Sequence, residues 1–143
     1  MTYTTTVQPR WSDMDVFGHV NHARIVTLLE EARVELLFGR AGAEGLPELA
    51  KGVVVVRLAV DYRAPLVVDG GAIRVEISLA ELKTASFTLD YKVYGGQSDP
   101  DRIAVVARTV LAPYDVGGSR PRRLADAERH FLTRWLGQEE PGA

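Results

Sequence analysis

The chain has no cysteine, which excludes a disulfide framework, a zinc site with thiolate ligands and a cysteine nucleophile. It also lacks a strong charge of either sign: the formal net charge of −2 provides no basic field, so we expect no nucleic-acid partner. No apolar run approaches the length needed to cross a bilayer, and residues 1–10 contain no apolar signal-peptide core. We therefore expect a cytoplasmic protein that has no membrane partner.

What the chain does contain is ordinary for a globular protein. Of its 143 residues, 46% are hydrophobic and 25% are charged. That length is enough to bury a substantial core within one unit. No repeat, low-complexity segment or linker interrupts the pattern, so we expect a single domain over residues 1–143.

Hydrophobic spacing predicts one long helix among several strands. Apolar residues at helical spacing begin at about residue 22, in the order Ile25, Leu28, Leu29, Ala32 and Leu36. Asn21 is well placed as the N-cap, and we expect the helix to end near Gly39, with Gly42 and Gly45 in the loop beyond. A short C-terminal helix is expected over residues 125–136.

The other segments are predicted to be strands separated by turns. β-Branched and aromatic residues, or alternating apolar residues, predict strands at 3–11, 53–62, 73–79, 87–93 and 103–111, with turns at 69–71 and 95–100. The continuous apolar start of segment 53–62 predicts a strand that is covered on both faces. The order is satisfied by an α+β fold in which one antiparallel five-stranded sheet wraps around the central helix. Because the edge strands of such a sheet need partners, we expect a dimer or higher oligomer.

Residues 11–33 carry the chemistry, because acidic side chains, a glycine, two histidines and an asparagine stand directly before the long helix. A carboxylate at Asp15 would lie near free helix N–H groups, where it could act as base or nucleophile on a carbonyl group. The alternative is that Asp13 or Asp15 merely caps the turn through its own backbone. For Asp13 we expect a structural role in orienting the loop.

His22 is the second candidate, through a backbone N–H that would receive an oxyanion or an imidazole that would contact substrate. The alternative is an exposed histidine with no role. His19 and His22 stand three residues apart beside two aspartates, but this spacing lacks the helical face of the HExxH motif, so we expect no metal. Ser86 opens a strand without a GxSxG elbow, so it is not a triad nucleophile.

At this point the motifs resemble a known family. Residues 13–15, 18–21 and 30–33 resemble the DxD…GHVN…EEAR signature of hotdog-fold acyl-CoA thioesterases, in the branch of 4-hydroxybenzoyl-CoA thioesterase. Residues 61–66 and the turn at 69–70 are similar to the Y-x-x-P-L…G segment of that family. The matches fall in three separate regions, and their order covers residues 3 to about 115.

The resemblance implies roles for individual positions. Asp15 matches the catalytic aspartate, His22 the backbone N–H that polarises the thioester carbonyl, and Gly18 the glycine that lets the loop approach substrate. Many relatives have asparagine where this chain has His22, a difference that leaves the backbone role intact. The family binds coenzyme A at a dimer interface, which implies a homodimer or homotetramer. We expect the remaining substrate contacts at His19, Asn21, Lys83, Ser86 and Arg120.

The sequence thus predicts a hydrolase that cleaves an acyl-CoA or acyl-carrier-protein thioester to a carboxylic acid and a free thiol. It implies no cofactor, because coenzyme A is part of the substrate. The rival interpretation is a non-catalytic hotdog protein that binds acyl-CoA without hydrolysing it. A dehydratase would need a different Asp/His pairing for removing a proton from carbon, which the sequence does not show.

Overall fold

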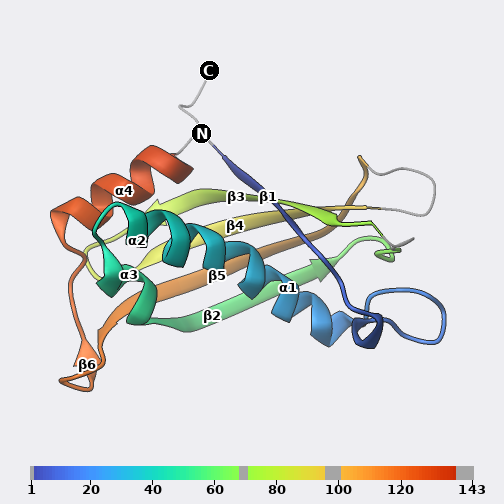
Figure 1. Cartoon of the computed structure of the whole chain (residues 1–143), viewed down its shortest axis with the longest axis horizontal. Coiled ribbons are helices and arrows are strands. Elements are labelled where there is room, and N and C mark those ends of the chain that lie inside the picture. The colour runs from blue at the N-terminus through green and yellow to red at the C-terminus, as the bar shows by residue number, and fades with distance from the viewer. Residues whose placement is uncertain (1, 68–70, 96–100, 138–143) are drawn as a thin grey trace.

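The computed structural model describes residues 2–67, 71–95 and 101–137, and it confirms the predicted hotdog architecture. One long helix, α1 (His22–Val34), lies across one face of a curved antiparallel sheet, as Figure 1 shows. The strand order is β1-β3-β4-β5-β2. The strands are β1 (Tyr3–Val7), β2 (Val53–Tyr62), β3 (Ile73–Leu82), β4 (Phe87–Tyr94) and β5 (Ile103–Asp115). A two-residue strand, β6 (Arg120–Pro121), pairs with the end of β5, and α4 (Asp126–Leu136) completes the chain.

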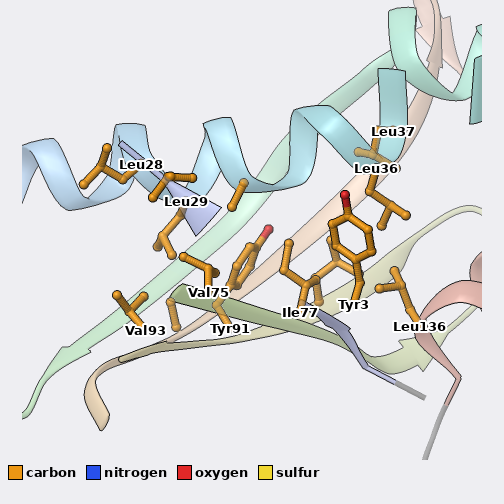
Figure 2. Close-up of a cluster of buried hydrophobic side chains, with 14 of the residues drawn as sticks. Tyr3, Leu28, Leu29, Leu36, Leu37, Val75, Ile77, Tyr91, Val93 and Leu136 are labelled. Carbon is orange, nitrogen blue, oxygen red and sulfur yellow. The ribbon is translucent and has the colours of Figure 1, made fainter. Parts of the chain in front are cut away.

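The helix α1 begins as its sequence predicts. The side-chain oxygen of Asn21 accepts a hydrogen bond from the Ala23 N–H at 2.9 Å, so Asn21 is the N-cap. The expected apolar stripe is buried, with exposed fractions of 0% to 3% at Ile25, Leu28, Leu29, Ala32 and Leu36. Figure 2 shows this stripe facing the sheet, with Leu28, Leu29 and Leu36 on one side of the layer and Val75, Ile77 and Tyr91 on the other.

The prediction that the helix ends near Gly39 is wrong. The helical path continues through the π-helical segment η2 (Glu35–Arg40) and α2 (Ala41–Ala43). It ends at Gly45, whose φ of +77° is the left-handed conformation that terminates helices, and the Leu46 N–H then donates to the Ala41 carbonyl at 2.8 Å. Gly39 adopts no such conformation, so it does not stop the helix. A further short helix, α3 (Pro47–Lys51), occupies the expected loop.

Strand β2 also differs from expectation, because it is an edge strand and not one covered on both faces. The helix α1 packs against β1 and β3, while β2 lies at the other edge of the sheet. Five of its apolar side chains are 40% to 63% exposed: Val54, Val55, Val56, Leu58 and Tyr62. An apolar run predicts that a strand will be covered, but it does not identify the surface that covers it.

The strand alternation of β3 and β4 is confirmed, since every second side chain from Ile73 to Leu79 and from Phe87 to Val93 is buried. The first strand is shorter than predicted and ends at Val7, because Pro9 cannot donate to the ladder and the chain turns through the short helix η1 (Trp11–Asp13). The predicted turns at 69–71 and 95–100 fall largely on residues 68–70 and 96–100, which lie outside the described residues.

Candidate active site

The loop between η1 and α1 is a tight hairpin. Met14 and Val20 form an isolated antiparallel bridge, and the Asp15 N–H donates to the His19 carbonyl at 2.8 Å. The turn closes with a bond of 3.2 Å from the Gly18 N–H to the Asp15 carbonyl. Gly18 has a φ of +78°, a conformation that side chains disfavour, so the turn itself requires a glycine at this position.

The Asp15 carboxylate is held at one oxygen. Its Oδ1 accepts the Phe17 N–H at 2.8 Å and the His19 N–H at 3.1 Å, which is the turn-capping role considered as an alternative for this residue. Asp15 is exposed, and no hydrogen bond from the described residues reaches Oδ2. The two interpretations are therefore compatible, because one oxygen orients the carboxylate while the other is available to a ligand.

Asp13 has the structural role that we expect for it. It is 1% exposed, and its Oδ2 accepts the Arg10 N–H at 2.7 Å. Its backbone carbonyl accepts the Asn21 N–H at 2.8 Å, which joins η1 to the N-cap of α1. Through these two bonds Asp13 fixes the hairpin of Asp15 relative to the helix.

The first turn of α1 provides one free donor. The Ala23 N–H binds the Asn21 side chain, and the Arg24 and Ile25 N–H groups bind the Asn21 carbonyl at 2.9 and 3.1 Å. The His22 N–H has no hydrogen-bond partner in the part of the chain that the structure describes. It lies at the positive end of the helix dipole, so it can donate to an anion or to a polarised carbonyl oxygen.

Asp15 and His22 line one cavity of about 400 Å³. His19, Val20 and Ile25 contribute to it, and residues 62–66, which contain the second family-like motif, form the rest of its wall. The Val20 N–H donates to the Leu66 carbonyl at 2.9 Å, which ties that segment to the hairpin. The structure thus brings together Asp15, His19 and His22 from one motif and the Y-x-x-P-L segment from another.

A second cavity of about 510 Å³ adjoins the hairpin, and Asp15 and Gly18 also contribute to its wall. Its remaining lining includes the exposed side chains of Trp11 and Val16, together with Met14. Asp15 therefore contributes to the walls of two cavities.

Tyr62 is a site residue to which the sequence assigned no role. Its hydroxyl donates to the His22 carbonyl at 2.8 Å, and its ring meets the His22 ring edge-on at 6.1 Å and 85°. The sequence signal for Tyr62 is weak, because it consists only of an aromatic residue at the end of a predicted strand, three positions before Pro65. Forty positions separate it from its partner, so only folding makes the pair visible.

Three expected substrate contacts lie elsewhere in the same chain. Val7, the last residue of β1 before the chain turns toward the hairpin, pairs with Ile73 at the start of β3, whereas Lys83 and Ser86 follow the far end of β3. Arg120 belongs to β6, which Figure 1 places at the end of the sheet away from the start of α1. The structure does not bring these residues to Asp15 within one chain, and their contact with substrate stays a prediction.

Arg120, Arg122 and Arg123 form a short basic cluster before α4, and this cluster is partly engaged in bonds within the chain. The Arg122 guanidinium binds the buried Glu128 carboxylate through two bonds of 2.7 and 2.8 Å. This bidentate pair anchors the start of α4, so Arg122 serves the fold. Within the described residues, no group of three or more His, Asp or Glu could hold a metal ion, and no helix is long and apolar enough to cross a membrane.

Comparisons with known proteins agree with this geometry. The family model of the thioesterase-like superfamily matches residues 9–136. A predicted thioesterase from Bacillus stearothermophilus superposes with a TM-score of 0.79 at 20% identity, over 97% of this chain and 99% of that chain. A thioesterase from Thermus thermophilus, in complex with coenzyme A and Zn, gives a TM-score of 0.75 at 26% identity, over 95% of each chain.

A 1,4-dihydroxy-2-naphthoyl-CoA thioesterase from Synechocystis shares the fold, with a TM-score of 0.73 at 18% identity over 92% of this chain and 96% of that chain. A comparison with curated proteins gives no match. The family match covers nearly the whole chain and includes both motifs of the cavity. The chain therefore belongs to the thioesterase-like superfamily, as a thioester hydrolase with the hotdog fold.

Proposed function

We propose that this protein hydrolyses the thioester of an acyl-CoA or an acyl-carrier protein, with Asp15 and the start of α1 as its catalytic groups. One observation carries the proposal: Asp15 and His22, whose N–H has no partner among the described residues, line the same cavity. A carboxylate beside an N–H donor at a helix start is the pair that hydrolysis of a carbonyl compound needs.

The His22 N–H would donate to the thioester oxygen, which gains negative charge as the carbonyl carbon becomes tetrahedral. The helix dipole adds to that stabilisation. In a general-base route, Asp15 takes a proton from water, the resulting hydroxide bonds to the carbonyl carbon, and the C–S bond breaks. The proton held by Asp15 then passes to the leaving thiolate, so that a carboxylic acid and a free thiol result.

In a nucleophilic route, an Asp15 oxygen itself bonds to the carbonyl carbon and the thiolate leaves, which forms an anhydride that water then cleaves. A single turnover in H₂¹⁸O detects an anhydride that water cleaves at its aspartyl carbonyl. General-base catalysis places the heavy oxygen in the released acid. Attack of water on the aspartyl carbonyl of the anhydride instead places it in the Asp15 carboxylate.

Coenzyme A is the thiol that we favour, because the Thermus thermophilus relative is a thioesterase that holds it. The proposed chemistry uses side-chain and backbone groups of this chain, and it calls for no cofactor beyond the coenzyme A that substrate carries. Both aliphatic and aromatic acyl groups are candidate substrates, and a cytoplasmic location stays a prediction.

The functional unit that we propose is a homodimer or homotetramer formed along β2. This strand is bonded to β5 on one side, and the described residues contain no strand that pairs with its other side. Its exposed valines and Leu58 form an apolar edge next to Tyr62, which lines the cavity. Pairing with a second copy would cover that edge and complete the wall of the site.

The test is release of free thiol from short, medium, long and aromatic acyl-CoAs, and from an acylated carrier protein. Wild type is compared with Asp15→Asn and with Asp126→Asn, a matched loss of one exposed carboxylate at the start of α4. We expect turnover by wild type and Asp126→Asn, and a loss of about 10²-fold or more in Asp15→Asn. Acyl-CoA binding without thiol release in wild type would contradict the proposal and support the non-catalytic alternative.

A further inference from the structure

We propose that Tyr62 is a positioning residue that sets the orientation of the His22 N–H and links it to the edge strand β2. This inference rests on the proposed function, in which that N–H stabilises the oxyanion. Tyr62 itself needs no contact with the reacting atoms. Its hydroxyl acts on the backbone of the first turn of α1, at 2.8 Å from the His22 carbonyl oxygen.

The bond from Tyr62 holds a peptide group that is also held from its other side. The His22 carbonyl and the Ala23 N–H belong to the same peptide plane. The Tyr62 hydroxyl binds the carbonyl, while the Asn21 side chain binds the N–H at 2.9 Å. A plane fixed at both ends has little freedom to rotate. The plane before it carries the His22 N–H and is joined to it at the His22 Cα, and its own carbonyl, that of Asn21, accepts the Arg24 and Ile25 N–H groups. With both planes held, the direction of the His22 N–H is restricted.

The ring of Tyr62 adds a second contact with the same residue. Its edge-on arrangement with the His22 ring, at 6.1 Å, is a geometry that aromatic pairs prefer. Hydroxyl and ring therefore act on different parts of His22: the hydroxyl on the backbone and the ring on the imidazole. This separation makes the two contributions distinguishable by mutation.

The location of Tyr62 gives these contacts a further consequence. It is the last residue of β2, whereas the buried stripe of α1 packs toward β1 and β3 at the opposite edge of the sheet. Tyr62 thus connects the start of α1 to the strand along which we propose that two copies associate. A shift of β2 on association would reach the His22 N–H through this bond.

Tyr62 is 48% exposed and His22 is exposed as well, so the contact buries little surface. Its contribution to global stability is accordingly small, and its effect should be seen in turnover. We expect Tyr62→Phe, which removes only the hydroxyl, to lower kcat by about 3- to 10-fold, the scale of one hydrogen bond, with KM changed less than about 2-fold.

The matched control is Tyr94→Phe, which removes a hydroxyl that donates to Glu76 at 2.9 Å on the sheet. It should leave kcat and KM unchanged. The same Tyr62→Phe change is then made in His22→Ala, which keeps the backbone carbonyl but has no imidazole. Because the hydroxyl meets the backbone, the factor lost in kcat should be the same in both backgrounds. A loss confined to the background with the imidazole would overturn the backbone mechanism.

Amide hydrogen exchange provides a readout that does not depend on activity. Exchange in a peptide that spans residues 22–26 should become faster in Tyr62→Phe and stay unchanged in Tyr94→Phe. Unchanged exchange in Tyr62→Phe refutes the positioning role. If no acyl thioester is hydrolysed by wild type but exchange rises as expected, the positioning role stands and the proposed function fails.

Discussion

The two oxygens of Asp15 allow its structural and chemical roles to be separated by substitution. Asparagine keeps Oδ1, so it can still accept the Phe17 and His19 N–H groups, but it has neither the charge nor the basicity of a carboxylate. Alanine removes the acceptor as well. Both variants should therefore lose activity, while only Asp15→Ala should lose the two side-chain hydrogen bonds that support the hairpin.

The size of the structural loss follows from those two hydrogen bonds. Each is worth about 0.5–1.5 kcal/mol net, and in an exposed hairpin the freed N–H groups return to water, so we expect about 1 kcal/mol for Asp15→Ala. For a domain of this size that corresponds to a fall of roughly 3 °C in Tm. Asp15→Asn should change Tm by less than about 1 °C. Turnover should fall by about 10²-fold or more in both.

The assay combines thiol release from the best acyl-CoA of the panel with thermal unfolding of the same preparations. Asp13→Ala is the comparison for the structural effect. Asp13 is 1% exposed, so removing its carboxylate leaves the Arg10 N–H without its acceptor. This variant should therefore lower Tm more than Asp15→Ala does. Turnover near the wild-type rate in Asp15→Asn would refute the catalytic assignment. Equal Tm losses in Asp15→Asn and Asp15→Ala would refute the role of Oδ1.

Three further predictions concern the helix start, the C-terminal helix and the edge strand. Asn21→Ala removes the N-cap of α1 and should lower the free energy of unfolding by about 1 kcal/mol in urea titrations, with a fall in kcat because the first turn frays. Burial acts to raise the pKa of Glu128, but the Arg122 guanidinium and a backbone N–H outweigh it and hold that pKa below the ordinary 4.5. The charged carboxylate therefore stabilises the fold above about pH 4.5, and this contribution is lost as pH falls through the lowered pKa. When Tm is measured against pH, it should fall more steeply toward acid pH in wild type than in Glu128→Gln. Val56→Lys on the 63% exposed edge of β2 should shift sedimentation toward monomer, whereas Val116→Lys, at 65% exposed outside the sheet, should not; equal behaviour of the two variants would exclude β2 as the interface.

Elements whose signals are local could be predicted from the sequence. Apolar residues at helical spacing predicted the buried stripe of α1, and Asn21 predicted its N-cap, because both depend on neighbours within one or two turns. The alternation of Ile73, Val75 and Ile77 predicted a strand with one buried face for the same reason. The hairpin of Asp15 and the start of α1 are adjacent in sequence, so the central part of the site was also predictable.

Which distant groups meet depends on tertiary packing. The apolar run of β2 predicted a strand, but its position at the sheet edge depends on which strands the chain pairs, and that is a property of the whole sheet. The low helix propensity of Gly39 predicted a helix end there, but burial of Leu36 and Leu37 outweighed it. The helical path therefore continues to Gly45, which has a left-handed conformation. The bond between Tyr62 and the His22 backbone joins residues forty positions apart, and no local rule specifies it. Local propensity acts along the chain, whereas the site is assembled by contacts across it, and these exist only once the sheet and the helix have packed together.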